Sequence, residues 1–238
     1  MSVFLKINII IFILYFVPSV WMSQAVYFIS KVNNWNDRPN NIEVTPLKNK
    51  HYFRRFNNEW KRNKCESLGF KFNESFFRSY DHDTILNNSI LILLTTPLQN
   101  YSNCFVDQDN NCVFKALSLA ICGNISYFQK IRGKVIDNIK NSIELKNFLG
   151  GKRRFNNYTL FKTDGDFVGD YGSVIEVLAT AEYLDVCIYV YEDECNQWII
   201  YRKDWPNYES IDMKTENCIY LNLYKQSFRI VTAVNTYI

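Results

Sequence analysis

The sequence predicts one α+β domain that follows an extension and an apolar leader. Helical periodicities fill the middle of the chain, and runs rich in β-branched and aromatic residues follow them, an order typical of α+β domains. The 238 residues are 47% hydrophobic and 21% charged, which suits one globular core. The formal net charge is only +3, so we expect no nucleic-acid partner.

The leader, residues 1–25, has the features of a secretory signal peptide. Lys6 is the only charge before Lys31, and the apolar run 7–17 follows it. Ser23-Gln24-Ala25 has the small-x-small pattern that signal peptidase cleaves. We therefore expect cleavage after Ala25 and entry into the secretory pathway, with the protein secreted.

Two other interpretations of the leader stay open. Apolar character resumes over residues 26–29, so residues 5–29 reach the ~20 residues that cross a bilayer. An uncleaved signal anchor would then make a membrane protein. The third interpretation is a buried N-terminal helix, since the segment has no polar face.

The extension, residues 26–100, divides into an expected linker and an expected helix. Residues 32–46 are rich in Asn and contain two prolines, which indicates a loop or linker. Residues 48–64 hold seven basic residues and one acid, with Phe53, Phe56 and Trp60 spaced as on one helical face. This basic aromatic helix would either dock by its aromatic stripe or contact an anionic surface.

The domain, residues 101–238, is expected to begin with helices and end with strands. Before it, residues 89–96 are a short apolar run that fits a strand or a buried helical turn. A polar, glycine-containing region at 147–170 predicts a long loop. The expected helices are 113–121, 126–143 and 172–184, and the expected strands are 186–191, 198–201, 218–223 and 229–234. The fold class is thus α+β, with helices packed around a small, mostly antiparallel sheet.

Seven cysteines limit the chemistry of the chain. No pair has C-x-x-C spacing, so we expect no zinc site, no redox pair of that kind and no cofactor. An odd number leaves at least one cysteine outside any disulfide in a secreted protein, and Cys112 is the natural candidate. Most of the others are expected to be small buried apolar residues.

Cys112 is the candidate nucleophile. It follows the polar loop Asp109-Asn110-Asn111 and begins an apolar helical segment. The positive end of the helix dipole should lower the pKa of such a thiol, and the N–H groups of the loop could face an oxyanion. The chain has two histidines, His51 and His82, and both precede Cys112.

The segment from Asp109 to Ser118, Asp-Asn-Asn-Cys-Val-Phe-Lys-Ala-Leu-Ser, resembles the Asp-Gly-Asn-Cys-Leu-Phe-Arg-Ala-Leu-Ser signature of the OTU (ovarian tumour) cysteine proteases, most of which are deubiquitinases. Further segments are similar in order. They are the helix around Ile131-Arg132, the stretch 169–179 with Tyr171 at a Trp position and Glu176 at the Glu position, the strand 186–191, and the strand pair 219–223 and 227–231. Together they cover about residues 103–235.

The resemblance implies an OTU-like, papain-like cysteine protease fold and a role for each matching residue. Cys112 would attack the isopeptide carbonyl after the ubiquitin C-terminus, and the loop Asp109, Asn110, Asn111 would form the oxyanion hole. A His on the closing strand would be the base, oriented by an acid two residues later. Here Ser227 stands at the base position and Arg229 at the acid position, and neither side chain accepts a proton near pH 7.

Three hypotheses follow from this resemblance. The first is a pseudoenzyme that binds ubiquitin or a ubiquitin-like partner. The second is an active thiol isopeptidase that uses either His82, with Asp81 or Asp83 beside it, or another unusual base. The third is a secreted or membrane-tethered binding protein that reuses the fold.

Overall fold

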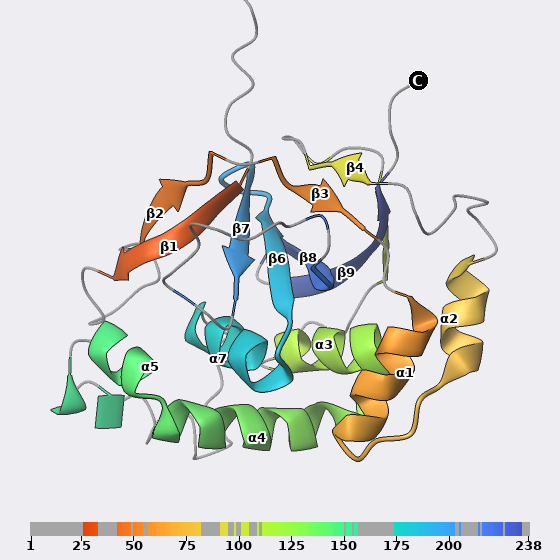
Figure 1. The fold of residues 1–238 in the computed structure, drawn as a ribbon, viewed down its shortest axis with the longest axis horizontal. Helices are drawn as coiled ribbons and strands as arrows, with labels where there is room; N and C mark the ends of the chain where they lie inside the picture. The colour runs from red at the N-terminus through yellow and green to blue at the C-terminus, as the bar shows by residue number, and fades with distance from the viewer. Residues whose placement is uncertain are drawn as a thin grey trace, which may run out of the picture.

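A seven-stranded mixed sheet forms the centre of the computed structural model (Figure 1). The strand order is β2-β1-β7-β6-β8-β9-β5. The pairs β1–β7 and β6–β8 are parallel, and the other four pairs are antiparallel. The strands are β1 (Val26–Val32), β2 (Ile42–Pro46), β5 (Tyr101–Cys104), β6 (Cys187–Glu192), β7 (Gln197–Tyr201), β8 (Cys218–Tyr224) and β9 (Ser227–Val234).

The structure describes residues 26–32, 42–48, 50–54, 57–81, 91–94, 98, 101–104, 109, 111–149, 151–153, 155–156, 174–202, 205, 214, 216–225 and 227–234. The predictions made for the leader, His82, Asn110 and Tyr171 lie outside these residues.

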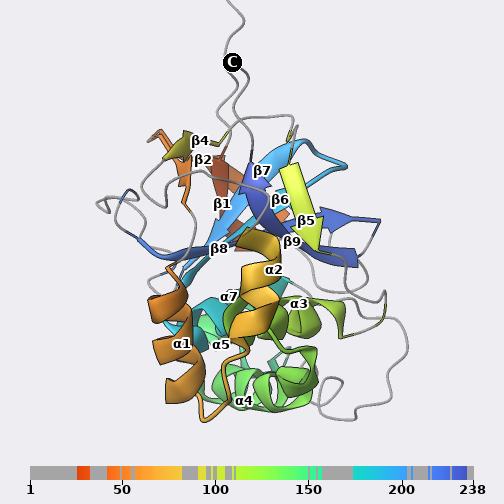
Figure 2. The same ribbon diagram turned by 90° about the vertical axis from the view of Figure 1, so that its right-hand side faces the viewer.

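The helices lie on one side of the sheet (Figures 1 and 2). Their core side chains join those of alternate sheet positions, including Ile188, Ile219 and Phe228, in one hydrophobic cluster. We call it the helix-side core. The helices are α1 (Asn58–Ser67), α2 (Glu74–Asp81), α3 (Cys112–Cys122), the 3-10 turn η2 (Ile125–Tyr127), α4 (Phe128–Asn141), α5 (Ile143–Phe148) and α7 (Val174–Leu184).

The opposite face of the sheet is covered by a short antiparallel pair of strands, β3 (Tyr52–Phe53) and β4 (Ile92–Leu93). Phe53 and Ile92 pack there against aromatic residues of β6, β7 and β8, among them Tyr189, Trp198 and Tyr220. We call this cluster the aromatic core. The sheet is therefore buried on both faces, which explains its nearly continuous apolar strands.

The α+β class and the mostly antiparallel sheet are confirmed, with the helices on one face rather than around the sheet. The three predicted domain helices appear as α3, α4 and α7, and the four predicted strands as β6 to β9. The helix predicted over 126–143 ends at Asn141, because Ser142 caps the separate helix α5 by accepting from the Leu145 N–H. Ile143 is the first residue of α5, where it is 67% exposed.

Two predictions for the extension are wrong in part. The linker expected at 32–46 contains β2, and β1 pairs with β7, so the extension contributes to the same sheet as the domain. The basic helix expected at 48–64 begins only at Asn58, where the Asn57 side chain caps it. Phe53 belongs instead to β3, because its ring packs on Tyr220 with 4.6 Å between ring centroids.

Candidate active site around Cys112

Cys112 is the first residue of α3, as predicted, but its side chain is fully buried. The Cys112 N–H donates to the Asp109 carbonyl over 3.1 Å, and the Lys115 N–H donates to the Asn111 carbonyl over 2.9 Å. These bonds close the loop onto the first turn of the helix. The sequence motif therefore does place a thiol at a helix N-terminus.

Side chains hold the loop before Cys112 in this shape. One Asp109 carboxylate oxygen accepts from the Asn111 N–H over 2.9 Å, and the other pairs with Lys115 Nζ at 2.6 Å. Asn111 Oδ1 accepts from Arg132 of α4 over 2.7 Å. The Lys115–Asp109 pair and the Arg132 contact thus tie the loop to two helices.

This arrangement affects the oxyanion hole predicted for Asp109, Asn110 and Asn111. The Asn111 and Cys112 N–H groups both donate to Asp109. An oxyanion hole requires N–H donors aimed at the substrate oxygen. These two N–H groups would therefore have to give up their hydrogen bonds to Asp109 before they could bind an oxyanion. The oxyanion role stays a prediction.

The expectation of a lowered thiol pKa is wrong for this structure. Burial has the largest effect and raises the pKa of Cys112. The hydrogen bond from the Phe228 backbone N–H lowers this pKa by less, and the Asp109 carboxylate raises it further. Withdrawal from water disfavours the charged thiolate more than the helix end favours it. Cys112 is therefore held as a neutral thiol at pH 7.

Strand β9 passes directly beside Cys112, because Phe228 donates its N–H to the sulfur. Ser227 and Arg229 flank Phe228 in β9, opposite Tyr224 and Asn222 of β8. Ser227 is buried, and the Arg229 guanidinium lies 4.4 Å from the centre of the Tyr224 ring. The strand that carries Ser227 and Arg229 thus adjoins the thiol, with a hydroxyl and a cation on the two sides of Phe228.

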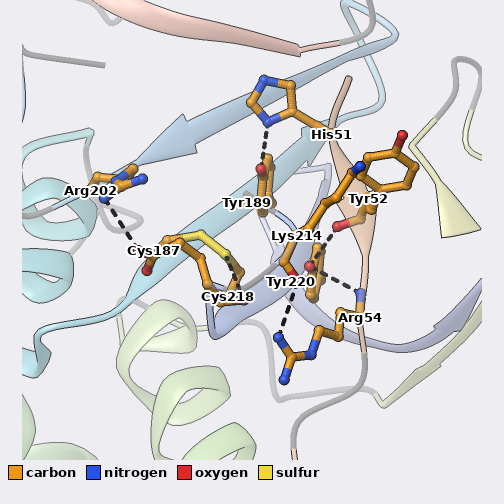
Figure 3. Close-up of a disulfide and its surroundings, with 10 residues drawn as sticks. His51, Tyr52, Arg54, Cys187, Tyr189, Arg202, Lys214, Cys218 and Tyr220 are labelled. Atoms are coloured by element: carbon orange, nitrogen blue, oxygen red, sulfur yellow. Dashed lines mark hydrogen bonds and ion pairs between the residues drawn. A yellow bond between two sulfur atoms is a disulfide. The ribbon is translucent and has the colours of Figure 1, made fainter. Parts of the chain in front are cut away.

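A polar cluster also lies in the aromatic core, and no sequence motif predicts it (Figure 3). His51 is buried, and its Nδ1 lies 2.6 Å from the Tyr189 hydroxyl oxygen. Cys187 and Cys218, register partners in β6 and β8, form a disulfide nearby. His51 is thus on the other side of the sheet from Cys112 and cannot be its base.

Within the described ranges, no group of three or more His, Cys, Asp or Glu side chains is arranged to hold a metal ion. Nothing in the sequence marks the His51 cluster. His51 is far from Tyr189 in the chain, and the packing of the β3–β4 pair on the sheet brings them together.

No protein-family model and no curated protein matches the chain. Solved structures similar to its fold are OTU domains. They include the OTU domain of human OTUD1 (16% identity, TM-score 0.42, covering 54% of this chain and 83% of that one) and the viral OTU domain protease from Dera Ghazi Khan virus (14%, 0.44, 59% and 85%). An OTU domain in complex with ubiquitin is similar at 19% identity and TM-score 0.42, covering 54% of this chain and 67% of that one.

The burial of Cys112 predicts a slow reaction with alkylating reagents. In the native protein at pH 8 we expect iodoacetamide to modify Cys195, which is exposed, long before Cys112. Only the thiolate of an accessible cysteine reacts. Peptide mapping by mass spectrometry measures both rates, and denaturant should remove the difference. Equal alkylation rates of Cys112 and Cys195 in the native protein would contradict the burial of Cys112.

Proposed function

We propose that this protein is a catalytically impaired OTU-like protein that acts by binding ubiquitin or a ubiquitin-like protein. The observation that carries the proposal is the strand beside the thiol. β9 adjoins Cys112 through the Phe228 N–H, while Ser227 and Arg229 occupy the positions that the family resemblance assigns to the base and its orienting acid.

The chemical consequence of these two residues is large. A positioned general base contributes roughly 10²–10⁴-fold to a rate. Neither a hydroxyl nor a guanidinium takes a proton from a thiol at pH 7, and no acid is provided for the leaving amine. Burial of Cys112 in its neutral form further supports a binding role over turnover.

Titration calorimetry with mono-ubiquitin and di-ubiquitin tests the binding role. We expect wild type and Cys112→Ala to bind with equal affinity, because the thiol is buried, and we expect neither protein to cleave di-ubiquitin. Cys195→Ala controls for the loss of a cysteine as such. If neither protein binds at high concentration, the proposal fails.

The retained Cys112 at a helix N-terminus favours one second candidate, an active deubiquitinating thiol protease with His82 as an unusual base. A ubiquitin propargylamide probe distinguishes the two. Wild type should stay unlabelled under reducing conditions if the pseudoenzyme proposal is right. Labelling of Cys112 that disappears in His82→Ala would instead establish the protease.

For location, we propose secretion after cleavage behind Ala25, with a signal-anchored membrane protein as the alternative. Two observations support secretion. β1 incorporates Val26–Val32 into the sheet, which removes residues 26–29 from any membrane span, and a disulfide is typical of oxidising compartments. No helix in the described part of the chain is long and apolar enough to span a membrane.

Expression with a C-terminal tag tests the location, since the mature N-terminus can be sequenced from the medium and from the membrane fraction. Val26 as the first residue in the medium is the expected result. An intact leader in the membrane fraction would favour the anchor. A secreted protein that fails to bind ubiquitin would favour a binding protein that merely reuses the fold.

A further inference from the structure

Two buried cysteines meet where the extension packs on the domain. Cys65 lies near the end of α1 and Cys122 is the last residue of α3, and both side chains are fully buried in the helix-side core. Helix α1 packs against α3, and the two free thiols lie close enough for each to shift the pKa of the other. They are separated by 57 positions in the sequence, so the contact depends on the fold.

The backbone around both cysteines is fixed by further bonds. The Cys65 carbonyl accepts from the Phe70 N–H over 3.0 Å, and the Cys122 carbonyl accepts from the Asn73 N–H over 2.9 Å. Gly123 follows with φ +65°, and a Cβ on it would lie 2.7 Å from the Asn73 carbonyl oxygen. A glycine is therefore required for the segment after α1 to lie against the end of α3.

We propose that Cys65 and Cys122 are a disulfide-forming pair, which covalently joins α1 of the extension to α3 of the domain when the protein folds under oxidising conditions. The proposal rests on the contact between the two thiols and does not depend on ubiquitin binding.

The reaction needs a disulfide as the oxidant, such as glutathione disulfide. One cysteine thiolate attacks a sulfur of the oxidant and releases one glutathione thiolate. The second cysteine then attacks the resulting mixed disulfide and releases the other. Two S–H bonds are lost and one S–S bond forms, while two electrons reduce glutathione disulfide to two glutathione molecules, which take up the two protons.

The other described cysteines are placed less favourably. Cys187 and Cys218 are already joined, and Cys195 is exposed in the turn between β6 and β7. Cys112 is at the opposite end of α3, 11 residues long, which separates it from Cys122 by about 15 Å. Pairing of Cys65 with Cys122 therefore leaves Cys112 outside the disulfides.

Burial of the two thiols also determines when the disulfide can form. Desolvation raises the pKa of both Cys65 and Cys122, and both are closed to solvent. Thiolate is scarce and the oxidant is excluded once the core has formed. The bond should therefore form during folding, and added oxidant should act slowly on the folded, reduced protein.

Oxidative refolding of the full chain tests the pair. Reduced, denatured protein is refolded in a glutathione/glutathione disulfide buffer, quenched with acid, alkylated and mapped by mass spectrometry. We expect linked peptides for Cys65–Cys122 and for Cys187–Cys218, with Cys112 and Cys195 alkylated. Alkylation of both Cys65 and Cys122, or a link from either to another cysteine, would overturn the proposal.

Thermal unfolding gives an independent readout that separates the bond from packing. For each protein we take the difference between the Tm after oxidative refolding and the Tm after reductive refolding. This difference is compared between wild type and Cys65→Ser, since both retain Cys187 and Cys218. Closing a loop of this length should add roughly 10 °C to the wild-type gain. Cys195→Ser should behave as wild type. If Cys65→Ser does not fold, Cys65→Ala replaces it. Equal gains in wild type and variant would count against the pair.

Discussion

Replacing Trp198 with alanine is expected to lower the free energy of unfolding by about 3–5 kcal/mol. Trp198 is fully buried in the aromatic core, where its ring lies 5.2 Å from that of Tyr191 and 6.5 Å from that of Tyr220 between centroids. Strand β1 and the β3–β4 pair contribute Val26 and Phe53 to the same core. Loss of the indole would leave a cavity where the extension packs on the sheet.

Urea unfolding followed by far-UV circular dichroism measures this loss. Trp198→Phe should lose less, because it keeps an aromatic ring in the core. Ile143→Ala is the matched surface control, because Ile143 is an apolar side chain that is 67% exposed, and its change should stay within about 0.5 kcal/mol. A Trp198→Ala loss as small as that of Ile143→Ala would mean that the aromatic core is not formed as described.

Acidification is expected to destabilise the protein through His51. Burial, and secondarily the charge of Arg202, lowers the pKa of His51 from 6.5 to about 4. The unfolded chain therefore takes up a proton near pH 6.5, while the folded protein stays neutral at this site until about pH 4. The unfolded state binds more protons throughout this window, so the free energy of unfolding falls as the pH falls from about 6.5 to about 4.

The expected loss across the window is up to about 3 kcal/mol, since each pKa unit is worth 1.36 kcal/mol. The chain has only two histidines, which gives a clean comparison. His51→Gln should flatten the pH dependence of the unfolding free energy between pH 6.5 and 4, and His82→Gln should keep it. The same slope in wild type and His51→Gln would assign the acid sensitivity to carboxylates instead.

The helices of the domain could be predicted from the sequence because one buried face imposes a regular apolar spacing on each. In α4, for example, the regularly spaced Ile131, Val135 and Ile139 are buried. The same criterion failed for Phe53, which lies in β3, whereas Trp60 does lie in helix α1 and Phe56 lies outside the described residues. Phe53 is held in β3 by Tyr220, a residue more than 160 positions away, and local spacing carries no information about such a contact.

The sequence predicted where Cys112 lies in the fold, but it did not predict the pKa of its thiol. The motif placed Cys112 at the start of a helix, which the structure confirms. Its raised pKa depends on how closely β9 and the core surround the sulfur, and burial of that kind is a property of tertiary packing. The His51–Tyr189 contact and the Cys65–Cys122 pair were missed for the same reason.

The parallel pairing of β1 with β7 has a consequence for how the chain folds. Val26 is paired with Trp198, 172 positions later. Strand β1 can therefore pair with β2 early, but most of the chain must be made before β7 can join its other edge. Contacts of such long sequence separation form slowly, and unpaired apolar strands aggregate while they wait. Production of the protein should therefore be limited by the kinetics of sheet closure and improve with slower synthesis or added chaperones.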